Sequence, residues 1–256
     1  MNPIVLIPAR MASTRLPGKP LAEIHGEPMI VQVWRRAIEA DIGRVVVAAG
    51  EDAIVRAIVE VGGEAVVTDP SHPSGTDRIS EALRRIDPDG AHDMIVNLQG
   101  DLPVLEPKTV RTAIEALARV GDADMGTVAC AIHDPGDLME TSVNKVVAAW
   151  EQDGRFGRAL YFSKWPVPWG DGEVFHHIGI YTYRRAALDR FVALPPSPLE
   201  KRERLEQLRA LEAGMRIEVG RVETVPLGVD TPAQLEQARR LLDPARPSQS
   251  PGEPFA

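Results

Sequence analysis

The chain has 256 residues and a formal net charge of −8, with 44% hydrophobic residues, 26% charged residues and one cysteine. This acidic balance argues against broad electrostatic binding to nucleic acid or to an anionic membrane, and a single cysteine excludes an intrachain disulfide framework. No apolar stretch has the length of a membrane span, and the start, MNPIVLIPAR, lacks the pattern of a signal peptide, so a soluble cytoplasmic protein is expected.

Strands and helices are predicted to alternate in the N-terminal part of the chain. Short apolar runs predict strands, and apolar residues at helical spacing predict helices. The predicted strands cover residues 4–7, 44–50, 64–69 and 93–101, and the predicted helices cover residues 28–41, 51–63 and 80–86. This alternation indicates βαβ units around a parallel sheet.

The pattern becomes strand-rich in the middle of the chain. Only one short candidate helix, at 135–141, separates four strand-like runs, at 125–132, 143–150, 159–167 and 176–183. Cys130 lies in the first of these apolar runs, which favours a buried structural thiol over a nucleophile. We expect a β-rich excursion here, at about residues 143–190, that adds a sheet or an interface element.

The C-terminal part returns to helices. The spacing of leucines predicts one helix over 198–214, followed by a strand over 216–225 and a last helix over 231–242 with a capping-box pattern at its start. The tail, 244–256, is rich in Pro and Ser and is predicted to be disordered. The chain therefore reads as one α/β domain, 1–243, with a β-rich excursion and a tail.

The loop PARMASTRLPGKPL, residues 8–21, carries three cations directly after the first predicted strand. The carboxyl end of a strand is where open α/β sheets bind ligands. The surroundings of Gly18 and Lys19 do not match the Walker A pattern, and no GxGxxG motif opens a helix. Arg10, Arg15 and Lys19 could still bind phosphates, aided by small neighbouring residues; the alternative is a solvated basic loop.

Three further loops carry polar residues: HPSGTDR (72–78), LQGDLP (98–103) and GVDTP (228–232). By itself the first is a common turn, Asp101 in the second is a turn residue or a metal ligand, and Asp230 in the third is a helix N-cap or a ligand. Taken together, the two carboxylates could share one Mg²⁺ while the loop cations hold a nucleoside triphosphate. That combination is typical of nucleotidyl transfer.

These motifs resemble a known family. IPARMASTRLPGKPL, HPSGTDR, NLQGDLP, NKVV, ALYFS, HHIGIY, LEQLRALE and GVDTP follow the order seen in the 3-deoxy-manno-octulosonate (Kdo) cytidylyltransferases, over residues 4–242. The resemblance implies a Rossmann-like α/β nucleotidyltransferase fold with a mixed central sheet, and a homodimer formed through the β-rich insertion. It also implies Mg²⁺ dependence and transfer of CMP from CTP to Kdo, with release of pyrophosphate, for lipopolysaccharide biosynthesis.

The resemblance also implies roles for individual residues. For the nucleotide these are Pro8, Ala9, Arg10, Ser13, Arg15, Lys19, Ser74, Gly75 and Gln99. Arg15 and Lys19, with the metal ligands Asp101 and Asp230, are the implied catalytic residues. For the sugar acid they are Gln99, Lys164, His177, Tyr181, Glu206 and Gln207. From the residues alone, a histidine in a strand is more often structural, and a glutamate on a charged helix is more often solvated.

Two positions depart from the family pattern. Lys164 follows ALYFS where the family usually has Arg, which exchanges a bidentate guanidinium for a point charge. Leu102 replaces an acidic residue next to Asp101, which leaves open whether one or two metal ions bind. The sugar acid could therefore be a modified one, such as 8-amino-Kdo or a sialic-type acid. A more remote alternative is a nucleotide-binding module without catalysis.

Overall fold

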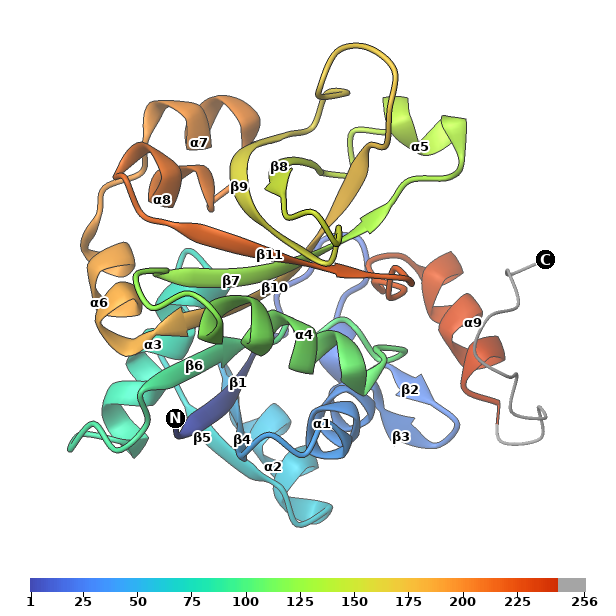
Figure 1. Cartoon of the computed structure of the whole chain (residues 1–256). Helices are drawn as coiled ribbons and strands as arrows, with labels where there is room; N and C mark the ends of the chain where they lie inside the picture. The colour runs from blue at the N-terminus through green and yellow to red at the C-terminus, as the bar shows by residue number, and fades with distance from the viewer. Residues whose placement is uncertain (244–256) are drawn as a thin grey trace.

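A mixed sheet forms the centre of the computed structural model, which describes residues 1–243. Within these residues nine strands lie side by side in the order β5 (Glu64–Val67), β4 (Arg44–Ala49), β1 (Pro3–Ala9), β6 (Met94–Asn97), β10 (Phe175–Arg184), β7 (Met125–Ala131), β11 (Ile217–Val222), β9 (Phe156–Ser163) and β8 (Lys145–Trp150) (Figure 1). Strands β5, β4, β1 and β6 are parallel, whereas β10 is antiparallel to both of its neighbours β6 and β7. The predicted mixed α/β sheet is confirmed.

Helices cover both faces of the sheet, which explains the nearly continuous apolar runs of the parallel strands. On one face, α3 (Gly75–Ile86), α6 (Arg185–Ala193) and α8 (Leu208–Glu212) contribute buried residues to an apolar cluster with Ile4 and Leu6 of β1. On the other face, α1 (Met29–Glu39), α2 (Asp52–Glu60) and α4 (Pro107–Ala118) pack with Val5 and Ile7. Alternate residues of β1 thus pack into the apolar clusters on opposite faces of the sheet.

The last helix packs against the loop that follows β1. Leu235 and Ala238 of α9 (Pro232–Leu241) share a small apolar cluster with Ile24 and Met29, near the two-stranded β2 (Glu23–Ile24) and β3 (Glu27–Pro28) ribbon. Val229 belongs to the same cluster, and its N–H donates to the carbonyl of Asp101 at 2.9 Å. This packing brings the start of α9 to the carboxyl edge of the sheet.

The β-rich excursion is continuous with the central sheet. Strand β10 lies in the middle of that sheet, and the β8–β9 hairpin follows β11 at one edge and stands at the top of Figure 1. The hairpin also turns back, because β8 pairs with the start of β10. As a result, β10, β7, β11, β9 and β8 close into a ring of paired strands. A short helix, α5 (Pro135–Met139), connects β7 to β8, as predicted.

Several predicted elements need correction. The helix over 198–214 is two helices, α7 (Pro198–Glu203) and α8, because Arg204 takes a left-handed conformation with φ 57°. Residues 75–78 belong to the first turn of α3 rather than to a loop, since the Ser74 hydroxyl caps that helix by accepting from the Asp77 N–H at 3.1 Å. Helices α4 and α6 were not predicted. The strands predicted over 93–101, 159–167 and 216–225 end earlier, at Asn97, Ser163 and Val222.

The predicted disordered tail, 244–256, lies outside the described residues. No helix of residues 1–243 combines the length and the apolar character needed to cross a membrane.

A buried carboxylate connects α3 to α6. Asp87 is 5% exposed and accepts hydrogen bonds from the N–H groups of Ala91 and His92 and from Arg185. Burial by itself would raise the pKa of Asp87, but the two N–H donors and Arg185 outweigh it and lower the pKa to about 2. Because this pKa lies below the usual value, the stabilisation is present above pH 3.8 and is lost as the pH falls through about 2.

We expect Asp87→Asn to lower the free energy of unfolding at pH 7 by about 1.5–3 kcal/mol, since hydrogen bonds to a charged group contribute that much. The difference from the unsubstituted protein should shrink as the pH falls below about 3. Urea unfolding at pH 7 and at low pH measures both effects. The exposed Asp89 provides the control, Asp89→Asn, which should have little effect. A pH-independent loss in Asp87→Asn would contradict this account.

Candidate active site

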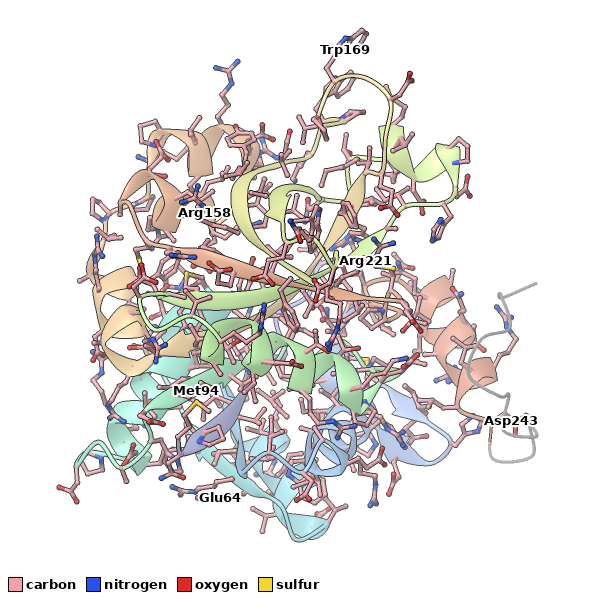
Figure 2. The ribbon with its side chains drawn as sticks, viewed as in Figure 1. Glu64, Met94, Arg158, Trp169, Arg221 and Asp243 are labelled. Atoms are coloured by element: carbon pink, nitrogen blue, oxygen red, sulfur yellow. The ribbon has the colours of Figure 1, made fainter. Side chains whose placement is uncertain are left out.

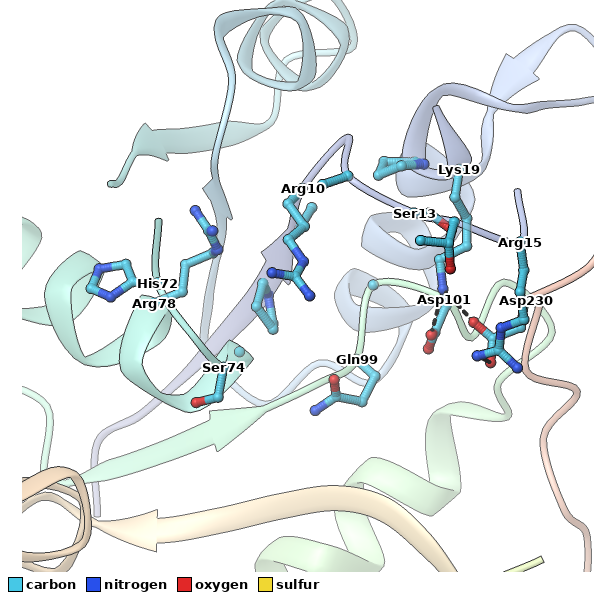
Figure 3. A pocket seen from close by; sticks show the side chains of 17 residues that line it. Arg10, Ser13, Arg15, Lys19, His72, Ser74, Arg78, Gln99, Asp101 and Asp230 are labelled. Carbon is cyan, nitrogen blue, oxygen red and sulfur yellow. Dashed lines mark hydrogen bonds and ion pairs between the residues drawn. The ribbon is translucent and has the colours of Figure 1, made fainter. Parts of the chain in front are cut away.

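A cavity of about 390 Å³ opens at the carboxyl ends of β1 and β6. It gathers all the residues predicted for the nucleotide and the metal: Pro8, Ala9, Arg10, Ser13, Arg15, Lys19, Ser74, Gly75, Gln99, Asp101 and Asp230. Figure 3 shows His72 and Arg78 at one end of this cavity, the four charged side chains of Arg15, Lys19, Asp101 and Asp230 at the other, and Arg10 between them.

The topology explains why these distant segments meet. Strands β1 and β6 are parallel neighbours, so the loops that follow them leave the sheet at the same edge. Gly100 lets these loops approach closely, because a Cβ atom there would lie 2.7 Å from the Pro8 carbonyl oxygen. The start of α3 and the start of α9 complete the walls. The cavity therefore lies where open α/β sheets bind ligands.

Lys19 bridges the two predicted metal ligands. Its Nζ lies 2.8 Å from Asp101 Oδ2 and 2.9 Å from Asp230 Oδ1, and Arg15 Nη2 lies 2.9 Å from the other oxygen of Asp230. Partial burial lowers the pKa of Lys19, but the two carboxylates outweigh burial and raise it above its usual value. Two cations thus face two anions at this end of the cavity, and Lys19 remains protonated at neutral pH.

The side chain of Asp230 is not used as a helix cap. Thr231 takes that role, with its hydroxyl accepting from the Gln234 N–H at 3.3 Å while Gln234 reaches back to the Thr231 N–H. The helix-cap alternative for Asp230 is therefore excluded, and its carboxylate is available as a ligand. Its carboxylate and that of Asp101 converge on a single point, which is the ammonium of Lys19.

This donor set fits a magnesium ion that completes its shell with substrate. Mg²⁺ prefers oxygen ligands and is often held by one or two carboxylates plus phosphate oxygens and waters. Among residues 1–243, no group of three or more His, Cys, Asp and Glu side chains could hold a metal ion. Asp101 and Asp230 offer two carboxylates at one point, so the remaining ligands would have to come from substrate and water.

Arg78 is a site residue whose burial was not foreseen. It lines the cavity, is 2% exposed, and donates to Thr68 Oγ1 at 2.6 Å and to the Pro70 carbonyl at 3.4 Å. Burial lowers the pKa of Arg78 from its usual value. His72, whose ring pairs with Glu81, lies beside it. The early start of α3 places Arg78 in this helix, facing inward, and the sequence pattern had assigned it to a loop.

A second cavity, of about 680 Å³, adjoins the first and shares Arg15, Gln99, Asp101 and Asp230 with it. His177 lines this second cavity. Its imidazole is buried, with Nε2 at 3.0 Å from Thr127 Oγ1 and Nδ1 at 3.5 Å from the Gln207 amide. Burial, with a smaller effect of His176, lowers the pKa of His177 to about 3, so the ring is neutral at physiological pH.

Gln99, also predicted for the sugar, lines both cavities, but the other four residues predicted for the sugar line neither. Lys164, Tyr181, Glu206 and Gln207 are absent from both walls, although three of them lie close behind. Glu206 accepts from the hydroxyl of Thr76, next to Gly75, at 2.7 Å. Gln207 contacts His177, and the Tyr181 ring lies 5.4 Å from the His177 ring. The left-handed Arg204 directs this segment towards the site.

Lys164 lies apart from that group, at the end of β9. Its N–H donates to Glu203 Oε2 at 3.0 Å, and its carbonyl accepts from the ammonium of Lys145 at 3.1 Å. Lys145 is completely buried and also donates to the Glu140 carbonyl at 2.8 Å. These contacts hold the backbone of residue 164 in place. Within residues 1–243 the Lys164 ammonium makes no hydrogen bond or ion pair.

The chain is similar to known proteins over most of its length. Residues 4–217 match the family model for cytidylyltransferases. The chain is 63% identical over 241 residues to the 3-deoxy-manno-octulosonate cytidylyltransferase of Parvibaculum lavamentivorans, covering 94% of this chain and 93% of the relative. It is 58% identical over 250 residues to the enzyme of that name from Rhodospirillum centenum, covering 96% and 97%.

Solved structures of cytidylyltransferases also resemble this chain. A CMP:2-keto-3-deoxy-manno-octonic acid synthetase complexed with CTP superimposes with a TM-score of 0.87 and 38% identity, covering 94% of this chain and 98% of that one. A cytidylyltransferase from Leptospira borgpetersenii, with a TM-score of 0.59 and 16% identity over 93% of this chain and 85% of that one, shares the fold alone. The chain therefore belongs to the cytidylyltransferase family and, within it, to the 3-deoxy-manno-octulosonate cytidylyltransferases.

Proposed function

We propose that this chain transfers CMP from CTP to the anomeric hydroxyl of Kdo, giving CMP-Kdo and pyrophosphate for lipopolysaccharide biosynthesis. The observation that carries the proposal is the gathering of the loop cations and both aspartates in one cavity at the carboxyl edge of the sheet. The names of the close relatives supply the nucleotide and the sugar acid. We also propose one catalytic domain over residues 1–243, acting in the cytoplasm.

In this proposal the nucleotide occupies the first cavity. Ser74 lies near Arg78 with Gly75 next to it in the chain, which suits the nucleoside, while Gln99 lies between Ser74 and Asp101, and Pro8 and Ala9 line the cavity at the end of β1. Ser13, Arg15 and Lys19 lie beside the aspartates and Arg10 lies between them and Arg78, which suits the triphosphate. Arginine binds phosphate through paired N–H donors, whereas lysine acts as a mobile point charge.

Asp101 and Asp230 would hold a Mg²⁺ ion. When bound, the ion polarises the oxygens that it holds and neutralises charge on the transferring phosphoryl group. The anomeric oxygen attacks the α-phosphorus in line, the bond to the bridging oxygen of pyrophosphate breaks, and the hydroxyl proton passes to solvent. Arg15 and Lys19 stabilise the charge that develops on the departing pyrophosphate. We assign no protein base.

In this proposal the sugar acid binds on the side of Gln99 that faces away from the nucleotide. Gln99 Nε2 donates to Asn97 Oδ1 at 3.3 Å, Asn97 Nδ2 donates to Thr76 Oγ1 at 3.4 Å, and Thr76 in turn donates to Glu206. This chain of hydrogen bonds links the nucleotide cavity to the segment that carries Glu206 and Gln207. Neutral His177 lies beside Tyr181 and uses its two ring nitrogens on Thr127 and Gln207, so its role in this proposal is to position Gln207 for the sugar. The contacts support a sugar site formed by these residues.

Glu206 gives a testable pH dependence. Burial raises the pKa of Glu206 above its usual value, and its hydrogen bond from Thr76 only partly opposes this. If the carboxylate binds a sugar hydroxyl, activity should fall as the pH drops through this raised pKa. We expect Glu206→Gln to lower kcat/KM for the sugar acid about 10- to 100-fold, mainly through KM, because a hydrogen bond to a charged group contributes about 1.5–3 kcal/mol.

The KM for CTP should change little in Glu206→Gln, and the acidic limb of the pH profile should shift or disappear. Steady-state kinetics between pH 4.5 and 8, on the order of ten pH values, measure this. Glu212→Gln, an exposed acidic position on α8, is the matched control. An unchanged KM for the sugar acid in Glu206→Gln would remove Glu206 from the sugar site.

Lys164 supports a second candidate, a cytidylyltransferase for a modified sugar acid. A lysine keeps the charge that pairs with the carboxylate of the substrate but cannot form the paired contact of an arginine. The candidate is tested with Lys164→Arg, assayed on Kdo and on 8-amino-Kdo. A change in the ratio of the two kcat/KM values would make residue 164 a determinant of sugar choice, and an unchanged ratio would reject the idea.

We propose that the β-rich segment also forms a homodimer. Its outer side chains include Leu160, which is 49% exposed, Trp165 at 61% and Trp169, which is fully exposed. Trp169 lies at the tip of the loop after β9, away from the central sheet (Figure 2). Exposed aromatic residues of this kind are typical of interfaces between proteins. Sedimentation equilibrium should give twice the mass of one chain, and Trp169→Ser with Trp165→Ser should shift it towards the monomer.

The proposed reaction is tested by pyrophosphate release. CTP and Mg²⁺ are combined with Kdo, 8-amino-Kdo, N-acetylneuraminate or no acceptor, with UTP and ATP as control nucleotides. Rapid release with CTP and Kdo alone is the expected result. Preference for another sugar acid would keep the nucleotide site and select the second candidate. CTP binding without release for any acceptor would overturn the catalytic proposal.

A further inference from the structure

Lys19 occupies the point on which the two predicted metal ligands converge. Its Nζ lies 2.8 Å from Asp101 Oδ2 and 2.9 Å from Asp230 Oδ1, and its side chain is only 16% exposed. A Mg²⁺ ion held by the same two oxygens would need both of them at about 2.0–2.1 Å. An ammonium group and a divalent cation cannot share this position, so one must leave before the other binds.

The charges around this point also disfavour a free divalent cation. The ammonium neutralises one carboxylate, and Arg15, at 2.9 Å from Asp230 Oδ2, neutralises much of the other. Arg10 and Arg78 add two further positive charges to the same cavity. A divalent cation approaching alone therefore meets paired carboxylates and a positive cavity, which repels it.

A bound triphosphate would change this balance of charges. Its oxygens carry several negative charges and are suitable partners for both Lys19 and Arg15. The Lys19 side chain is a flexible stem on the single turn of η1 (Lys19–Leu21), so the ammonium can move without unfolding an element. Once it moves to a phosphate, the two carboxylates are left facing the same point and become a cation site.

We propose that Lys19 closes the divalent-cation site of the free protein, and that the cation enters only together with a nucleoside triphosphate. The substrate is then the metal–nucleotide complex, bound in one step, rather than a nucleotide that joins a metalloprotein. Naming CTP as the nucleotide rests on the proposed function. The closed cation site of the free protein does not rest on the proposed function, because it depends only on the side chains of Lys19, Asp101 and Asp230.

The experiment measures Mn²⁺ binding, with Mn²⁺ as the probe, by electron paramagnetic resonance of the protein without nucleotide. The unsubstituted protein should bind Mn²⁺ weakly. Lys19→Met should bind Mn²⁺ about tenfold or more tightly, because the substitution removes the ammonium that competes for the two carboxylates. Adding Asp101→Asn and Asp230→Asn to Lys19→Met should remove that gain. Arg10→Met is the matched control, because it removes a cation from the same cavity that makes no ion pair with either aspartate among residues 1–243.

Equal Mn²⁺ affinity in Lys19→Met and in the unsubstituted protein would overturn the proposal, and so would an equal gain in Arg10→Met, which would indicate a general charge effect. Tight Mn²⁺ binding by the unsubstituted protein without nucleotide would also overturn it, and that measurement needs no variant to fold. Circular dichroism verifies that each variant is folded.

A second arm adds CTP and uses water-proton relaxation to distinguish protein-bound Mn²⁺ from the Mn²⁺–CTP complex in solution. CTP should create a protein-bound Mn²⁺ signal in the unsubstituted protein. If Lys19→Met binds Mn²⁺ more tightly but CTP produces no protein-bound Mn²⁺ signal, the closed cation site is supported. CTP is then rejected as the nucleotide, which counts against the proposed function. If Lys19→Met binds Mn²⁺ no more tightly than the unsubstituted protein, the closed cation site is rejected, whatever the result with CTP.

Discussion

Asp101→Asn is expected to lower kcat about a thousandfold, and Asp230→Asn by a similar factor. Each substitution keeps the shape of the side chain but removes one of the two negative charges that converge beside Lys19. A bound metal contributes several kcal/mol of charge stabilisation in the transition state, which corresponds to about three powers of ten in rate. Pyrophosphate release at saturating CTP, Kdo and Mg²⁺ measures the loss.

The fold should survive these changes. Both aspartates are partly exposed, at 30% and 38%, and neither caps a helix through its side chain. Asp69→Asn is the control: this carboxylate binds Ser71 near the cavity but does not line it. Rates close to normal in the double variant Asp101→Asn, Asp230→Asn would exclude these residues as the metal site.

The edge of the sheet that carries this site could be predicted from the alternation of strands and helices. A parallel sheet brings the loops after its strands to one edge, so the cations after β1 and the carboxylate after β6 are expected at the same edge, whereas the pairing of β1 with β6 is known only from the structure. For Asp230 the sequence left two roles open, because Asp and Thr are both good N-caps. The structure excludes the cap role by placing the Thr231 hydroxyl on the Gln234 N–H, and the ligand role of Asp230 stays a prediction.

The break in the helix over 198–214 could not have been predicted from local pattern. Leucines recur at helical spacing through the break, and Arg204, which takes the left-handed conformation, is a good helix former. The reason is tertiary: the turn allows Glu206 to reach Thr76 and Gln207 to reach His177. Contacts between distant segments outweigh propensity here, and they involve residues that the family resemblance assigns to the sugar.

Helix α4 is also missing from the prediction, but here the sequence does contain a signal for a helix. Pro107 stands at the first helical position, and the buried Val110, Ala113 and Leu117 recur at helical spacing. No helix is predicted between the loop at Asp101 and the strand-rich region. Its position matters for the site, since α4 packs against β7, β11 and β10 itself, the strand that carries His177 and Tyr181.

Lys19→Met is expected to lower kcat/KM for CTP by about 10²- to 10³-fold, which is the usual loss when one preorganised group that stabilises developing charge is removed. In the proposed reaction, the ammonium leaves the aspartates and follows the charge that accumulates on pyrophosphate. The raised pKa of Lys19 means that this charge is present across the neutral and mildly alkaline range. Steady-state pyrophosphate release with varied CTP measures the loss.

The same substitution should act in opposite directions on two observables, and this makes it informative. Methionine keeps the length of the stem but frees the two carboxylates, so the protein should bind a divalent cation more tightly while it turns over CTP more slowly. Loss of fold would weaken both, and a purely passive lysine would leave both unchanged. Lys201→Met, an exposed lysine on α7 (Pro198–Glu203), is the control for removing one positive charge. Slower turnover without tighter cation binding would leave Lys19 as a phosphate ligand only, because the metal site would then be open from the start.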